Sequence, residues 1–248
     1  MKEKVVSIII IILLYSCTTE QHEKAEQKPQ DKRELVLETL PKTLGEFEKS
    51  LIYQDLVNIQ EVDSSILVDL KYSTEDNFFG RDVYEELTNA YLPLDVAIDL
   101  KKASTILIDK HPDLRLLVFD AVRPHRIQEI LWEALDSIPA NVRKAYVADP
   151  SEGSLHNYGC AVDLSIYDLK KDSLLDMGTK YDYFGYLAYP RMESQMLASG
   201  ELSQGQIENR DLLRDVMLQA GFKPITSEWW HFNRTSLAQA KLRYELIK

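Results

Sequence analysis

Cysteine is scarce in this chain: only Cys17 and Cys160 occur among its 248 residues. Cys17 falls in an N-terminal segment with a separate role, argued below, so the folded part is left with one thiol and no intramolecular disulfide. Its stability must then come from the hydrophobic core, with or without a bound metal. Cys160 stands between Gly159 and Ala161 in an apolar stretch, and we expect it to be a small buried side chain rather than a metal ligand.

Basic residues are few relative to acidic ones. Lys and Arg number 29 against 40 Asp and Glu, which gives a formal net charge of −11 and an isoelectric point near 5.0. A surface of this sign repels a phosphate backbone. Nucleic acid is therefore not expected as a partner.

Long apolar runs are also missing. The run from Ile8 to Leu14 is too short to span a bilayer comfortably, and with its charged start it has the pattern of a secretory signal. It closes on Leu14-Tyr15-Ser16-Cys17, which resembles the lipobox of bacterial lipoproteins. We expect residues 1–16 to be a signal peptide and Cys17 to be lipidated. The alternatives are an ordinary cleaved signal and an uncleaved anchor.

The segment after Cys17 has hardly any apolar side chain as far as Arg33. Such a segment cannot bury enough surface to fold, so we interpret residues 17–37 as the lipidated cysteine and a flexible tether. Residues 38–248 then form one domain of ordinary size. The expected location is extracytoplasmic, on the periplasmic side, with the domain anchored to the membrane by its lipid and no protein partner implied.

Strands and helices are intermixed in that domain, without internal repeats. Hydrophobic periodicity and turn residues predict strands at 66–70, 114–119 and 161–166, helices from Pro93, from Pro124 and over 208–220, and extended chain over 224–232. Short strands mixed with helices indicate an α+β fold. We expect a single domain with a small, mainly antiparallel sheet flanked by helices, and a zinc site at the sheet.

Histidine is the scarce residue that carries the chemistry, with five in the chain. His22 lies in the tether, His111 precedes a proline that breaks a helix, and His125 opens a helix. These three are expected at the surface or as caps. His156 and His231 remain as candidate ligands.

Together with Asp163, these two histidines make a candidate zinc site. Two imidazoles and one carboxylate are three ligands of the kind a catalytic zinc takes, leaving one position open for water. Glu228 stands three residues before His231, where a base for that water would be wanted. From these residues alone, structural roles for His156 and His231 remain open.

The sequence around the candidate ligands resembles the zinc D-alanyl-D-alanine peptidases. The matching segments are Ser154-x-His156-x-x-Gly159-x-Ala161-x-Asp163 and Glu228-Trp229-Trp230-His231. Three more resemble the D-alanyl-D-alanine dipeptidase branch, the VanX type, in the same order: residues 69–80, 120–124 and 176–182. The likeness runs from about Leu56 to the C-terminus.

This resemblance implies a role for each matching residue. His156, Asp163 and His231 would hold one Zn2+, and Glu228 would be the general base for the zinc-activated water and then protonate the leaving amine. Arg123 would stabilise the developing oxyanion. The alternative roles are a hydrogen-bond partner of a ligating histidine for Glu228 and a structural salt bridge for Arg123.

A dipeptidase must also recognise both charged ends of a very small substrate. Asp182 matches the family's carboxylate for the substrate ammonium, Ser154 resembles the hydroxyl that meets the substrate carboxylate, and Tyr72 would wall the pocket. The structural alternatives are a solvated loop residue, a loop cap and aromatic packing, respectively.

The resemblance thus implies a zinc metallopeptidase that hydrolyses D-Ala-D-Ala to two D-alanines. One alternative is a D,D-carboxypeptidase on peptidoglycan stem peptides, from which the ammonium partner Asp182 would distinguish it. Another is a noncatalytic, wall-binding lipoprotein with structural zinc. The presence of Glu228 and Arg123 argues against that one, because a structural zinc site needs neither.

Overall fold

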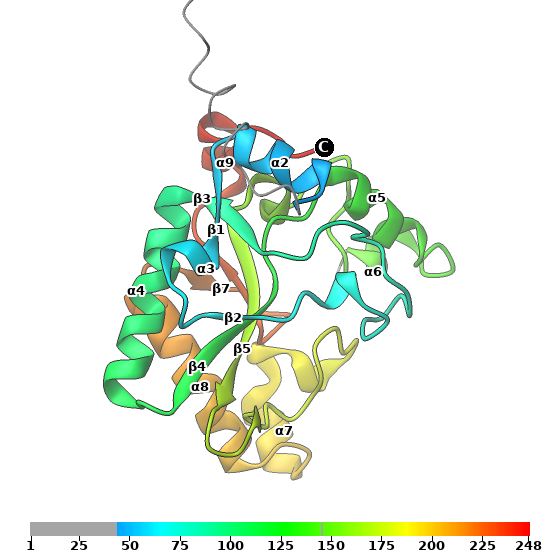
Figure 1. Cartoon of the computed structure of the whole chain (residues 1–248). Coiled ribbons are helices and arrows are strands. Elements are labelled where there is room, and N and C mark those ends of the chain that lie inside the picture. The colour runs from blue at the N-terminus through cyan, green and yellow to red at the C-terminus, as the bar shows by residue number, and fades with distance from the viewer. Residues whose placement is uncertain (1–43, 145) are drawn as a thin grey trace, which may run out of the picture.

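A central sheet organises the part of the chain that the computed structural model describes, residues 44–144 and 146–248 (Figure 1). The strands follow the order β2-β4-β5-β8-β7, and β6 pairs with β5 beside this path. Only the β2–β4 pair is parallel among these strands. The small, mainly antiparallel sheet is therefore confirmed. Its strands are β2 (Leu67–Val68), β4 (Leu114–Asp120), β5 (Ala161–Asp168), β6 (Ser173–Leu174), β7 (Lys223–Pro224) and β8 (His231–Asn233).

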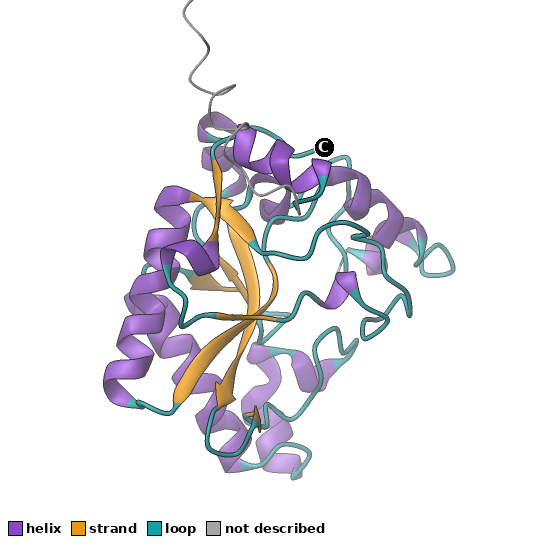
Figure 2. Ribbon diagram, in the orientation of Figure 1, coloured by secondary structure: helices purple, strands orange, loops and turns teal. Residues whose placement is uncertain are grey.

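Two long helices, α4 (Leu94–Lys110) and α8 (Gln204–Gln219), pack against each other on one side of this sheet (Figure 2). The predicted inward face of α4 is confirmed, since Val96, Leu100, Ala103 and Leu107 are all buried. On the other side lie α5 (His125–Glu133), α6 (Ala140–Arg143) and long connecting loops (Figure 1). These loops supply much of the site described below.

The remaining elements complete the α+β domain. Strand β1 pairs with β3 in a separate antiparallel ladder. The elements are α2 (Glu46–Tyr53), β1 (Leu56–Asn58), α3 (Ile59–Val62), β3 (Tyr91–Pro93), α7 (Glu193–Ser199) and α9 (Leu237–Arg243), with the 3-10 turns η1 (Lys71–Ser73), η2 (Leu155–Tyr158), η3 (Tyr186–Ala188) and η4 (Pro190–Met192).

The structure differs from the sequence predictions in the start of one helix and in the segment 224–232. Helix α8 begins at Gln204 rather than at 208, because Ser203 and Gln206 form a reciprocal capping box at its start. The extended segment predicted over 224–232 was wrong. Strands β7 and β8 are antiparallel neighbours, with Pro224 opposite Phe232, so the chain must reverse its direction within residues 225–230.

The expected burial of Cys160 is confirmed, since its side chain is fully buried. The predicted signal peptide, the lipidated Cys17 and the tether to residue 37 lie outside the described residues. Within the part that is described, no helix has the length and apolarity needed to cross a membrane.

Candidate metal centre

Three polar side chains of the site come from the neighbouring strands β4, β5 and β8, and the register of these strands brings them together. Asp163 on β5 stands opposite Asp120 on β4 and opposite His231 on β8. Residues directly opposite in an antiparallel ladder project from the same face of the sheet. Two acidic side chains and one imidazole are thus placed side by side, although they are far apart in the chain.

His156 comes from the 3-10 turn η2, just before β5. Gly159 ends this turn with φ of +61°, in the left-handed region that favours glycine. A Cβ added there would lie 2.6 Å from the Cδ of Pro93, so the turn packs directly on the start of α4. The position of His156 therefore depends on a close approach that only glycine allows.

The same turn is tied to the segment that carries Arg123. The Ser154 hydroxyl accepts a hydrogen bond from the His156 backbone N–H at 3.3 Å, and the Asn157 side chain accepts one from the Ser154 N–H at 2.7 Å. The Asn157 amide donates to the Arg123 carbonyl at 2.9 Å, and the Arg123 N–H donates to the His156 carbonyl at 3.0 Å. Ser154 is thus a loop cap, as one reading of the sequence expected, and its hydroxyl proton is not used by this bond.

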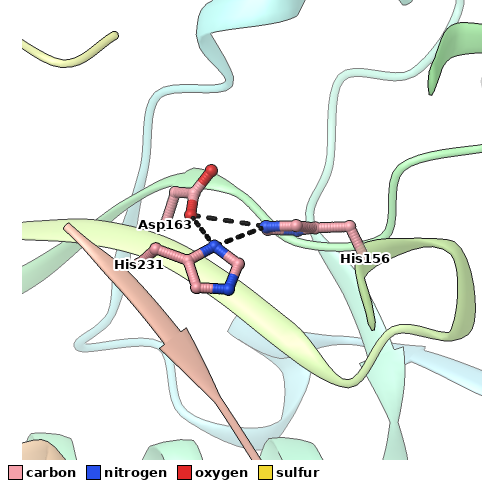
Figure 3. A group of neighbouring side chains, drawn as sticks. All are labelled: His156, Asp163 and His231. Atoms are coloured by element: carbon pink, nitrogen blue, oxygen red, sulfur yellow. Dashed lines mark hydrogen bonds and ion pairs between the residues drawn. The ribbon is translucent and has the colours of Figure 1, made fainter. Parts of the chain in front are cut away.

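Three possible ligand atoms converge at this point (Figure 3). The His156 Nε2 lies 3.2 Å from the His231 Nδ1, and the Asp163 Oδ1 lies 3.3 Å from the former and 2.9 Å from the latter. His156 and Asp163 are buried and His231 is nearly so. All three ligand atoms lie within 4.8 Å of one another.

Each of the two imidazole rings has one nitrogen at the candidate metal site and one turned away from it. The hydrogen bond of the nitrogen that is turned away determines the tautomer of the ring. The His156 Nδ1 lies 2.7 Å from the Ala121 carbonyl, which can only accept, so in the neutral ring the proton is on Nδ1 and Nε2 has the lone pair. The His231 Nε2 is likewise 2.8 Å from the Asn233 Oδ1, which leaves Nδ1 free. Three lone pairs facing one point repel each other unless a cation sits between them. Two such imidazoles and a carboxylate, each held from behind, fit a zinc ion.

Asp163 is ionised in this environment. Burial acts to raise its pKa, but the neighbouring His156 and His231 outweigh burial and lower the pKa well below its usual value. Its second oxygen, Oδ2, accepts a hydrogen bond from the Tyr181 hydroxyl at 3.0 Å and lies 3.4 Å from the Arg123 Nη2. Tyr181 was not predicted, although it stands in the matching segment 176–182 beside Asp182.

Arg123 is buried and held by several acceptors. Its Nε donates to the Asp120 Oδ2 at 2.8 Å and its Nη1 donates to the Gln128 Oε1 at 3.1 Å, while Asp120 also accepts from the Tyr84 hydroxyl at 2.5 Å. Burial acts to lower the pKa of Arg123, but Asp120 overcomes it and the pKa is raised well above its usual value. The salt bridge expected as an alternative role is present, and it fixes a permanently charged guanidinium on the wall of the site.

Glu228 lies in the connection between β7 and β8. Its Oε2 is 3.9 Å from the His231 Nδ1. Burial raises the pKa of Glu228 to about 8, an effect that His231 partly offsets and that the negative charge of Asp163 reinforces. The two tryptophans that follow are buried, and the Trp229 Nε1 donates to the Thr179 hydroxyl at 2.7 Å. Both tryptophans belong to the buried core, which holds the connection in place.

A cavity of about 260 Å3 is lined by the three candidate ligands. Asp182 lines it and accepts a hydrogen bond from the Tyr72 hydroxyl at 3.0 Å, while the Tyr72 ring lies under the Arg123 guanidinium. Burial and the negative charge of Asp163 raise the pKa of Asp182 to about 8. The structure thus brings every candidate metal, catalytic and substrate residue of the domain to one cavity: Tyr72, Arg123, Ser154, His156, Asp163, Asp182, Glu228 and His231.

The known proteins with similar sequences that follow share one described activity. The Peptidase_M15 family, described as D-Ala-D-Ala dipeptidase, matches residues 53–246. The D-alanyl-D-alanine dipeptidase of Escherichia coli (strain K12) is 31% identical over 188 residues, which cover 76% of this chain and 89% of that protein. The D-alanyl-D-alanine dipeptidase of Enterococcus faecium is 30% identical over 193 residues, covering 70% and 88%.

Solved structures show a weaker likeness. A variant of the vancomycin resistance D,D-pentapeptidase VanY in complex with Zn(II) is 14% identical, with a TM-score of 0.36, and the match covers 62% of this chain and 79% of that one. A likeness of this size carries no conclusion about the present chain.

Proposed function

The chain belongs to the D-Ala-D-Ala dipeptidase family of metallopeptidases, and we propose that it hydrolyses the free dipeptide D-Ala-D-Ala to two D-alanines. The observation that carries this proposal is one small cavity with a three-ligand metal centre and a carboxyl group, Asp182, on its wall. A cavity of about 260 Å3 is below the range of roughly 300–1,000 Å3 usual for drug-sized ligands, which favours a very small substrate.

His156, Asp163 and His231 would hold one zinc ion, the metal that this donor set fits. Zinc bound there would polarise the scissile carbonyl and make its coordinated water a better nucleophile near neutral pH. Asp163 contributes a negative charge, and the Ala121 carbonyl and Asn233 keep both imidazoles in the tautomers that bind metal.

Glu228 would be the proton carrier of the reaction. It would take the proton that the attacking water loses and deliver it to the leaving amine. Its carboxyl group is 3.9 Å from the ligand atom of His231, and its pKa of about 8 without a metal lies close to neutral pH. A divalent cation at the adjacent ligands would lower that pKa and leave Glu228 deprotonated, as a base must be before the reaction.

Arg123 would stabilise the negative charge that develops on the carbonyl oxygen. Asp120 and Gln128 hold its guanidinium in place before the substrate arrives, so little reorganisation is needed during the reaction. Because its pKa is raised well above the usual value, Arg123 keeps its charge throughout the working pH range.

Asp182 would bind the substrate ammonium, with Tyr72 orienting its carboxyl group. A carboxyl with its pKa raised by burial gains most from a cation that neutralises its ionised form. An acylated stem peptide has no ammonium at that position and would leave Asp182 without a partner. This is the reason for preferring a dipeptidase over a D,D-carboxypeptidase. The free hydroxyl proton of Ser154 would meet the substrate carboxylate.

The activity can be tested with the zinc-loaded protein, assayed for D-alanine release from D-Ala-D-Ala and from N-acetyl-D-Ala-D-Ala, with Glu228→Ala as the inactive control. Release from the free dipeptide alone supports the dipeptidase and the role of Asp182. Release from the acetylated form would make the protein a D,D-carboxypeptidase. No release from either, with zinc bound, would favour a noncatalytic binding protein.

We also propose that the enzyme works outside the cytoplasm, as a lipoprotein anchored through Cys17. The support is the N-terminal sequence alone, a charged start and a short apolar run that closes on Leu14-Tyr15-Ser16-Cys17. An enzyme in that place would meet dipeptide from wall turnover or from the medium. Labelling with a fatty-acid analogue, compared between the natural chain and Cys17→Ala, should show incorporation only in the former. Recovery of the mature chain in the cytosol would refute the proposal.

A further inference from the structure

A second cation lines the catalytic cavity and has no part in the chemistry described above. This is Lys144, in the loop between α6 and η2. Among the described cavity-lining residues, the other permanently charged cation is Arg123. Lys144 falls within the family match over residues 53–246 but outside the matching segments 69–80, 120–124, 154–163, 176–182 and 228–231, which gave each other site residue its role.

The proposed substrate needs a cation for its C-terminal carboxylate. At neutral pH a free dipeptide is a zwitterion, and Asp182 accounts only for its ammonium end. Arg123 is buried, and its nitrogens already face Asp120, Gln128 and Asp163. Its place in the proposed mechanism is moreover the scissile carbonyl.

Lys144 lines the cavity and is held by two acidic side chains. Its Nζ pairs with the Glu152 Oε1 at 2.6 Å and with the Asp149 Oδ2 at 3.2 Å. An ammonium group has three N–H donors, so these two bonds leave one donor available. The side chain is 43% exposed, which leaves room for a ligand to reach it.

The two acidic partners fix the ammonium relative to Ser154. Asp149 accepts hydrogen bonds from the backbone N–H and the hydroxyl of Ser151, and its carbonyl accepts from the N–H groups of Glu152 and Gly153. This tight turn leads directly into Ser154, whose hydroxyl is proposed to meet the same substrate carboxylate. Lys144 is therefore anchored to the turn that positions Ser154.

We propose that Lys144 binds the C-terminal carboxylate of the substrate together with Ser154, and so makes the enzyme specific for peptides with a free C-terminus. This inference rests on the proposed function. It adds a specificity-determining residue that touches the part of the substrate distant from the ammonium site.

The test compares a substrate that has the carboxylate with one that lacks its charge. The zinc-loaded enzyme, Lys144→Met and Lys144→Arg are assayed on D-Ala-D-Ala and on its C-terminal amide. Lys241→Met is the matched control, because the Lys241 Nζ donates to the Glu152 carbonyl of the same turn at 2.9 Å without lining the cavity. Thermal unfolding of each variant checks that the fold is intact.

Lys144→Met should lower kcat/KM about tenfold on the acid, the effect of one charge-assisted hydrogen bond, and leave the amide unchanged. Lys144→Arg should recover most of the activity, and Lys241→Met should match the natural enzyme on both substrates. An equal loss on acid and amide, or no loss on the acid, would overturn the proposal.

The outcome can be separated from the fate of the proposed function. If the natural enzyme cleaves only N-acetyl-D-Ala-D-Ala, the dipeptidase assignment fails, but that substrate has the same free C-terminus. Lys144 is then tested with the acetylated acid and its amide, with the same expected ratio. If the natural enzyme cleaves none of these peptides, the function and the role of Lys144 are both refuted.

Discussion

Replacing Gly159 with alanine tests how the site is built without assuming any activity. The glycine has a φ of +61°, and an added Cβ would lie 2.6 Å from the Cδ of Pro93, closer than real Cβ contacts come. Because Pro93 is rigid and stands at the junction of β3 and α4, the strain must be relieved by moving the turn η2. That turn carries His156, so both stability and metal binding should suffer.

The magnitude can be worked out against a second glycine. Forcing alanine into the left-handed region costs about 1–2 kcal/mol, and overpacking adds about 1–3 kcal/mol. Gly200 has a φ of +76°, and a Cβ added there would meet no atom within 4 Å, so Gly200→Ala should cost the backbone term alone. Any effect of alanine on the unfolded chain is common to both variants and cancels.

Urea unfolding of the metal-free variants should therefore show Gly159→Ala to be less stable than Gly200→Ala by about 1–3 kcal/mol. Zinc affinity, measured by competition with a chelator, should fall for Gly159→Ala and stay unchanged for Gly200→Ala. Equal stabilities, or a loss of stability with full zinc affinity, would refute the argument that this close contact positions His156.

Three further variants probe the site itself. Glu228→Gln should reduce kcat by about 10²–10⁴-fold while the zinc content by metal analysis stays the same, and near-normal turnover would exclude Glu228 as the base. Asn233→Ala should weaken zinc binding about 10–100-fold in chelator competition, because His231 loses the acceptor that selects its tautomer; an unchanged affinity would contradict this. Asp182 has a folded pKa of about 8, above its unfolded value, so the stability it contributes is complete below the unfolded pKa and is lost as the pH rises through 8. Metal-free Asp182→Asn should therefore be more stable than the natural chain in urea at about pH 9, with a gap that closes towards about pH 4, and a gap independent of pH would be the contrary result.

The elements that sequence predicted well are those with a strong local pattern. The apolar runs of β4 and β5 and the inward face of α4 needed no knowledge of their neighbours. The reversal at 225–230 was missed because it follows from the pairing of β7 with β8, which brings Pro224 opposite Phe232. Nothing within the segment itself distinguishes a hairpin connection from a strand.

In the site too, residues within a local motif were predicted, and residues whose contacts depend on the fold were missed. His156, Asp163 and His231 were predicted through matching motifs, because ligands of this kind stand at fixed places in them. Asp120 and Tyr181 were missed, although both stand in matching segments. Their contacts depend on the register that places Asp120 opposite Asp163 and on a loop that returns Tyr181 to the same carboxylate. The position of Asp120, three residues before Arg123, was the signal in the sequence that could have indicated their ion pair.

The balance of charge in the cavity connects metal binding with substrate binding. In the buried part of the cavity and directly behind it, Asp120, Asp163, Asp182 and Glu228 would together have four negative charges when ionised, and Arg123 has one positive charge. Lys144 lies in the exposed part of the cavity and is paired with Asp149 and Glu152. Without bound cations, raised pKa values of about 8 keep Asp182 and Glu228 largely protonated at neutral pH. A zinc ion and a substrate ammonium supply three positive charges, which matches the excess, while the substrate carboxylate is assigned to Lys144 and Ser154. Binding of both should therefore displace protons from the two carboxyl groups, and calorimetry in buffers of different ionisation enthalpy measures that release. Binding without proton release would show that the two carboxyl groups are already ionised in the free enzyme, and that the cavity attracts its cations by charge alone.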